Sequence, residues 1–132
     1  MKTALKAFVR KHTVLTGVAV ILVCWIGWDA SASMRGRIHA HFDIALGHYK
    51  VLGYGMPSPW RDEYVRLLKE RYGIEFHEAA LCIVSRSLVA YVDAYDEVSA
   101  EAAQRKFGHD IFEETAAEAR TKWEHRAQTG LP

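Results

Sequence analysis

The longest apolar run of the chain extends from Thr13 to Trp28 and contains no charged residue. A helix rises about 1.5 Å per residue, and the hydrocarbon core of a bilayer is about 30 Å thick. The run therefore crosses a bilayer only if the small residues up to Ser33 extend it, which places Asp29 at the interface. Indole rings such as that of Trp28 favour that level. We predict a transmembrane helix over residues 13–33.

The residues before this run predict its orientation. Positively charged side chains favour the cytoplasmic side of a membrane. No acidic residue occurs before Asp29, whereas four basic residues precede the run: Lys2, Lys6, Arg10 and Lys11. We expect residues 1–12 to form a basic N-terminus in the cytoplasm. Residues 34–132 then form a small domain outside the cytoplasm, in the periplasm if the cell is bacterial.

A cleavable signal peptide is the alternative interpretation of the same run. Ala30, Ser31 and Ala32 fit a small-x-small cleavage site after a basic start and an apolar centre. Cleavage there would make the domain a secreted protein. Trp25 and Trp28 are bulky residues close to that site, and the run is long for a signal peptide. These two features favour the uncleaved anchor.

The periodicity of the remaining chain predicts short elements in the order helix, strand, helix, strand, helix, helix. Residues 34–46 form a helix whose apolar side chains recur at spacings of three and four. Its main members are Ile38, Phe42 and Leu46. The helix either continues the membrane helix or is hinged at Gly36.

Local signals set the bounds of the later elements. A strand covers residues 48–54, and a helix begins with Ser58 as N-cap and ends at Gly73. A second strand covers residues 74–84, where alternation gives way to a continuous apolar run that enters a core. A long helix capped by Ser85 or Ser87 ends at Gly108, and the last helix begins at Asp110. The strand–helix–strand unit predicts an α+β domain with a minimal parallel sheet.

Charge and cysteine content argue against two classes of protein. The chain has 17 basic and 16 acidic residues without a basic block, which gives no support to nucleic-acid binding. Of its two cysteines, Cys24 lies inside the apolar run. Cys82 therefore has no partner in the exported part, so the domain is not a disulfide scaffold.

Two groups of residues suggest chemistry. Cys82, at the end of a strand and before a helix N-terminus, is a candidate catalytic thiol, with Ser85 and Arg86 assisting. Without a Cys-x-x-Cys motif or an adjacent His, a buried and inert thiol is favoured. An acidic group in the long helix could bind a cation, but we favour a solvated helix face for it: Asp93, Asp96, Glu97 and Glu101.

Three histidines are candidate metal ligands. On a strand, His39 and His41 would share one face with Asp43, and His48 would add a ligand. On the helix that we favour, His39 and His41 point in nearly opposite directions, and only His39 and Asp43 are neighbours. The helical periodicity therefore disfavours a metal site.

The segment from Gly53 to Trp60 is the candidate partner-binding loop. It joins a strand to a helix, where functional residues are common. Its members Tyr54, Met56 and Trp60 are residue types enriched in binding surfaces. The alternative is that Tyr54 and Trp60 pack as core beneath the loop.

These observations favour a single-pass membrane-anchored accessory or protein-interaction module. Its expected partners are the lipid bilayer and another protein, met through the sheet edge or the loop, and self-association is left open. The chain shows no coherent catalytic set, so an enzyme is disfavoured and no cofactor is expected. The alternatives are a small exported thiol-dependent enzyme or redox protein that uses Cys82, and a metal-binding module.

Overall fold

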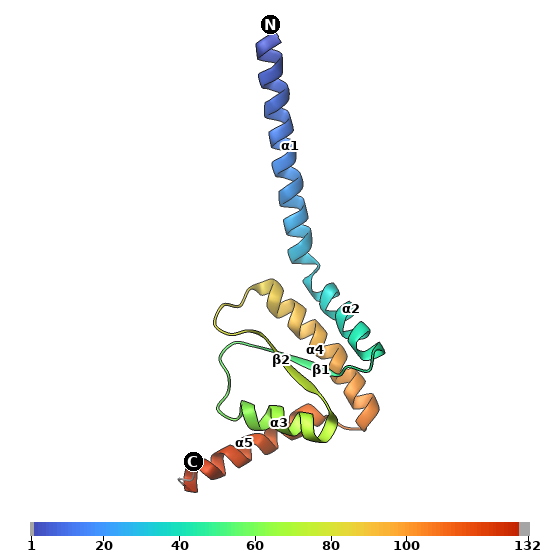
Figure 1. Ribbon diagram of the computed structural model, residues 1–132, viewed down its shortest axis with the longest axis vertical. Coiled ribbons are helices and arrows are strands. Elements are labelled where there is room, and N and C mark those ends of the chain that lie inside the picture. Colours follow the sequence, from blue (N-terminus) through green and yellow to red (C-terminus); the bar gives the residue numbers. More distant parts are fainter. Residues whose placement is uncertain (1, 130–132) are drawn as a thin grey trace. The chain divides into compact units, whose positions relative to one another are not determined.

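The computed structural model describes the backbone of residues 2–129 and the side chains of residues 13–129. Over this range it is mixed helical, with five helices and one two-stranded sheet (Figure 1). The chain divides into two compact units, Met1–Ala32 and Ser33–Pro132. The elements are α1 (Lys2–Ala30), α2 (Ala32–Ala45), β1 (Lys50–Tyr54), α3 (Arg61–Tyr72), β2 (Glu75–Ala80), α4 (Arg86–Phe107) and α5 (Ile111–Thr129). The predicted order of elements after residue 33 is confirmed.

Helix α1 contains one stretch, Thr13–Ala30, that is long and apolar enough to cross a membrane. None of that stretch is buried in the protein, and side chains such as Ile21 are about two-thirds exposed. Signal sequences share this length and composition, so the helix fits an anchor and a signal peptide alike. The basic side chains predicted to hold residues 1–12 in the cytoplasm lie outside the described side chains. The helical path is interrupted at Ser31, not hinged at Gly36 as the sequence allowed.

The sheet consists of β1 and β2, which run parallel as predicted. Lys50 lies opposite Glu75 and Gly53 opposite Glu78, and the register shifts after Gly53. Because the strands are parallel, their carboxyl ends lie at the same end of the sheet. The loops that follow β1 and β2 therefore leave the sheet side by side (Figure 1).

Strand β2 is shorter than predicted. It ends at Ala80 instead of residue 84, and the apolar run continues as a loop in which Leu81 is 51% and Ile83 is 91% exposed. The prediction was wrong because β1, its strand partner, ends at Tyr54, which pairs with Ala80. Residues beyond Ala80 have no strand to pair with before α4 begins.

Helix α2 packs through the face opposite to its periodic apolar side chains. Gly36 and Ala40 are buried, whereas Ile38 and Phe42 are 48% and 65% exposed. A Cβ atom at Gly36 would collide with the backbone carbonyl of Tyr91 on α4. Small residues let two helix backbones approach closely, and this contact, which periodicity alone does not reveal, selects the buried face of α2.

Two hydrophobic cores hold the second unit together. One contains Leu68, Ile74, Ala103 and Ile111, surrounded by aromatic rings. The rings of Tyr72 and Phe107 meet edge to face there, with centroids 5.0 Å apart. The other core contains Ala40, Tyr95 and Val98, with Ile44 and Leu52 packed against it. Helix α4 contributes buried residues to both cores.

Most of the predicted helix ends are confirmed. Ser85 accepts a hydrogen bond from the Leu88 N–H at 3.2 Å, and Gly73 and Gly108 end α3 and α4 in the left-handed conformation, with φ of 67° and 82°. Asp110 accepts hydrogen bonds from two N–H groups at the start of α5. The start of α3 was predicted wrongly: Ser58 forms a turn with Arg61 through its carbonyl, and the helix begins at Arg61.

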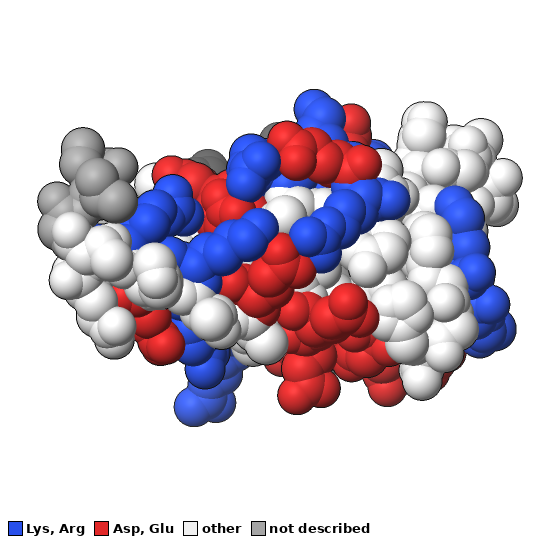
Figure 2. Space-filling view, turned by 90° about the horizontal axis from the view of Figure 1, so that it is seen from below, with Lys and Arg blue, Asp and Glu red and all other residues white. Residues whose placement is uncertain are grey.

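The face over α3 and α5 carries both signs of charge in close alternation (Figure 2). Glu63 lies 2.7 Å from Arg66, 3.4 Å from Lys122 and 3.5 Å from Arg126. Neighbouring Glu118 pairs with Lys122 at 2.8 Å. Because positive and negative side chains are interspersed, this face does not present a surface of one charge to an extended charged ligand.

Candidate functional site

The two loops at the carboxyl end of the sheet meet. The thiol Sγ of Cys82, after β2, lies 4.0 Å from the thioether Sδ of Met56, after β1. The parallel topology causes this contact, because it brings both strand ends to one edge. The predicted partner-binding loop is therefore half of a larger site.

Apolar side chains of both loops are exposed to solvent. Met56 is 80%, Ile83 91%, Leu81 51% and Tyr54 41% exposed, and Cys82 is exposed beside them. We call these five residues the loop patch. Exposed apolar side chains that form a contiguous cluster often mark an interaction site, whereas single scattered ones do not. Leu81 and Ile83 were missed by sequence reasoning because they were assigned to a buried strand.

A small cleft adjoins the loop patch. Its volume is about 180 Å³, and it is lined by residues that include Tyr54, Met56, Trp60, Tyr64 and Phe76. Pockets for cofactors and drug-sized ligands typically measure about 300–1,000 Å³. The cleft is therefore smaller than such pockets.

An ion pair and a glycine shape the cleft. Arg61 lies 3.1 Å from Glu78, and its guanidinium carbon is 5.9 Å from the centre of the Phe76 ring. A Cβ atom at Gly53 would collide with the Phe76 ring. Gly53 therefore lets this ring lie over β1, where it lines the cleft beside a charged pair.

Trp60 has a different environment from the other two predicted contact residues. Tyr54 and Met56 are exposed, whereas Trp60 is half-buried. Its ring meets Tyr64 edge to face at 5.9 Å and lies 5.4 Å from the guanidinium carbon of Arg120. Trp60 thus joins the loop to α3 and α5 while one side of its ring lines the cleft.

Helix α4 holds strand β1 and Tyr54 through two carboxylates. The Tyr54 hydroxyl donates to Asp93 at 3.0 Å, and the Leu52 N–H donates to Asp96 at 2.8 Å. Burial raises the pKa of Asp96 to about 7. The interpretation of the acidic group as a solvated face is wrong for Asp96, because this carboxylate binds the outer edge of β1.

Cys82 is exposed, so the expected burial of its thiol is wrong. The early end of β2 moves it from the core into a loop. In the described part of the chain, its one contact at hydrogen-bonding distance is with Met56. Ser85 uses its hydroxyl to cap α4, and Arg86 is exposed at the first residue of that helix. Among the described residues, neither Ser85 nor Arg86 is hydrogen-bonded to the thiol.

The three candidate metal ligands do not converge. His39 and His41 lie on helix α2, and His48 follows the end of that helix. Nδ1 of His39 contacts the Tyr91 hydroxyl, and its Nε2 lies 3.9 Å from Asp43. Between residues 13 and 129, no group of three or more His, Cys, Asp or Glu side chains is placed to hold a metal ion.

Asp43 forms a buried polar link that sequence reasoning missed. Its carboxylate accepts a hydrogen bond from Tyr95 at 2.6 Å and another from Lys50 at 3.3 Å. The bond from Tyr95 and the charge of Lys50 hold the pKa of Asp43 below its ordinary value. The link joins α2 to α4 and β1. The sequence signal that could have predicted this link is the position of Asp43 between Phe42 and Ile44, in an apolar part of the helix.

We compared the chain with known proteins. No family model, no curated protein and no solved structure matches it.

Proposed function

We propose that the protein is a single-pass membrane-anchored interaction module and that the loop patch binds a protein partner. The observation that carries the proposal is the pair of exposed apolar loops in contact at one end of the sheet, with Met56 80% and Ile83 91% exposed. The adjoining cleft offers a partner side chain an aromatic wall and an ion pair.

The physical basis of binding is burial of apolar surface. Fully burying a side chain such as Ile or Met is favourable by about 1.5–3 kcal/mol. Met56 also adapts its shape readily, because its thioether side chain is unbranched and flexible. Aromatic and Met side chains are common in the centres of interfaces.

Helix α1 supports the membrane location in this proposal. The Thr13–Ala30 stretch has the length and composition of a span. Basic residues before it support a cytoplasmic N-terminus and a domain on the other side of the membrane.

The test is partner recovery from detergent-solubilised membranes with tagged full-length protein. We expect Met56→Ala and Ile83→Ser each to lower recovery at least fivefold. Met34→Ala is the matched control, because it makes the same chemical change at a side chain that is 63% exposed on α2. It should leave recovery unchanged.

Thermal unfolding of the same variants separates binding from folding. Both loop side chains are exposed, so the melting temperature should stay within a few degrees of the parent. The proposal fails if both loop variants recover the partner normally, or if recovery falls only in proportion to lost stability. Equal losses with Met34→Ala would show non-specific adhesion and would also contradict it.

A further inference from the structure

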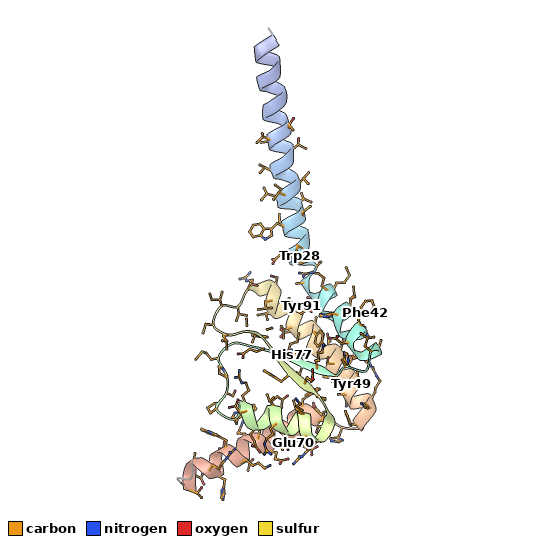
Figure 3. The ribbon with its side chains drawn as sticks, viewed as in Figure 1. Trp28, Phe42, Tyr49, Glu70, His77 and Tyr91 are labelled. Atoms are coloured by element: carbon orange, nitrogen blue, oxygen red, sulfur yellow. The ribbon has the colours of Figure 1, made fainter. Side chains whose placement is uncertain are left out.

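Helix α2 and the turn residue Leu46 that follows it carry a ridge of exposed apolar side chains. Met34, Ile38, Phe42 and Leu46 follow one another at intervals of four residues and are 63%, 48%, 65% and 70% exposed. We call them the α2 ridge. Figure 3 shows Phe42 on the outer side of α2.

The ridge is left exposed because α2 packs through its opposite side. Gly36 and Ala40 approach α4, and Asp43 binds Tyr95 on the same side. Residues four apart lie above one another on a helix, so the ridge forms one continuous strip. A single exposed apolar side chain is normal on a protein surface. Four in a row on one strip are not, so the exposure of the ridge calls for a physical reason.

Polar side chains border the ridge on both sides. At 100° per residue, Arg37 and His41 fall on one side of it and His39 on the other. A helix with an apolar strip bordered by basic and hydrogen-bonding residues is suited to the plane of a lipid interface. In such an interface the strip would enter the boundary between headgroups and acyl chains. His41 is exposed toward the polar side, whereas Arg37 is paired with Glu97 at 2.9 Å and His39 contacts Tyr91.

If α1 crosses a bilayer, the chain connection keeps the first residue of the ridge close to it. Met34 follows Ala30, the last residue of the apolar stretch of α1, by four residues. Four residues span at most about 14 Å even when fully extended. If α1 crosses a membrane, the first residue of the ridge is therefore within reach of the headgroup region, and lipid is the apolar phase nearest to it.

We propose that α2 is an interfacial helix whose ridge lies at the headgroup–acyl boundary of the bilayer that α1 spans. The proposal rests on the membrane anchoring in the proposed function, but not on the loop patch. It assigns the ridge to lipid and the patch to protein, which are two separate surfaces.

Depth-dependent fluorescence quenching in full-length protein tests the proposal. A fluorophore sensitive to polarity is attached to single cysteines, after Cys24→Ser and Cys82→Ser have removed the natural thiols. The sites are Phe42→Cys on the ridge, Val20→Cys in α1, and Lys69→Cys, exposed on α3, as the matched aqueous control. The protein is reconstituted in vesicles of phosphatidylcholine and phosphatidylglycerol that contain lipids with a quencher at shallow or deep positions.

The label at position 42 should emit at shorter wavelength than the label at 69 and be quenched at least threefold more by the shallow lipid. The label at position 20 should be quenched most by the deep lipid. Ile38→Cys repeats the ridge measurement if Phe42→Cys unfolds.

The control labels distinguish failure of the interfacial-helix proposal from failure of the membrane anchor. An unquenched label at 42 with a quenched label at 20 overturns the interfacial helix and leaves the anchor standing. An unquenched label at 20 overturns the anchor itself. If the label at 42 is shielded equally in vesicles and detergent and is not quenched by lipid, the ridge meets a second copy, and the lipid proposal is wrong.

Discussion

Asp43 and Asp96 are two carboxylates that the fold withdraws from water with opposite results. Asp43 receives the Tyr95 hydroxyl and the Lys50 ammonium, and its pKa is lowered. Asp96 receives a single backbone N–H, from Leu52, and burial raises its pKa to about 7. The number and charge of the donors decide the direction of each shift. Neither environment is readable from the sequence, because the donors come from segments more than 40 residues away or on another element.

Asp96→Asn should stabilise the domain at pH 8 and leave it nearly unchanged near pH 4. Below the ordinary pKa of 3.8, the carboxyl is protonated in both the folded and the unfolded chain. Between that value and about 7 the unfolded chain loses a proton that the folded chain keeps, so this group makes folding less favourable as pH rises. Asn retains an acceptor for the Leu52 N–H without the charge.

The gain in the free energy of unfolding at pH 8 is at most about 4 kcal/mol, from three pKa units at about 1.4 kcal/mol each. Denaturant unfolding of the detergent-solubilised protein at pH 5 and pH 8 measures it. Asp62→Asn is the control, since the Asp62 side chain is 98% exposed. A pH profile of Asp96→Asn parallel to that of the parent would contradict the assignment.

At the scale of the element, the sequence predicts what is local and misses what depends on a neighbour. Ser85, Gly73 and Gly108 end helices through bonds within their own turns, so their roles are read from adjacent residues. The buried face of α2 is decided by the approach of Gly36 to Tyr91, and the end of β2 by the length of β1. The exposed loop patch follows from the second of these facts. Half of the site was thus predictable, and its other half was not.

Gly36→Ala should destabilise the domain by up to about 2 kcal/mol. Alanine favours a helix interior over glycine by about 1 kcal/mol, whereas forcing a methyl group into a packed contact costs typically 1–3 kcal/mol. The colliding atom belongs to the Tyr91 backbone, which cannot rotate away as a side chain does. Denaturant unfolding provides the measurement, with His41→Ala on the exposed side of α2 as control. Equal or greater stability of Gly36→Ala would show that the two helices separate without loss.

At the scale of the whole molecule, the proposals place one apolar helix in a membrane and a small domain outside it. The domain buries little, because one two-stranded sheet and four short or medium helices form its two cores. Small domains of this kind are marginally stable alone.

The full-length chain should remain in the membrane fraction after an alkaline wash and should keep its N-terminus. The apolar Thr13–Ala30 stretch, whose one charged residue, Asp29, lies near its end, is the physical reason. Intact-mass spectrometry of the purified protein gives the measurement, and a mature chain beginning at Ser33 would establish cleavage instead. Protease applied on the extracytoplasmic side should digest the domain, and full protection would reverse the orientation.

Helix α4 has a mechanical consequence for the binding that we propose at the loop patch. It begins at Arg86, next to the patch, and Asp93 holds Tyr54 of the patch by a hydrogen bond. Further along, α4 supplies Tyr95 to one core and Ala103 to the other. A helix of 22 residues is about 33 Å long and resists stretching through its ladder of backbone hydrogen bonds. A force applied at Tyr54 is therefore transmitted to α4 through Asp93 and distributed over both hydrophobic cores. The loops of the patch do not have to resist it alone.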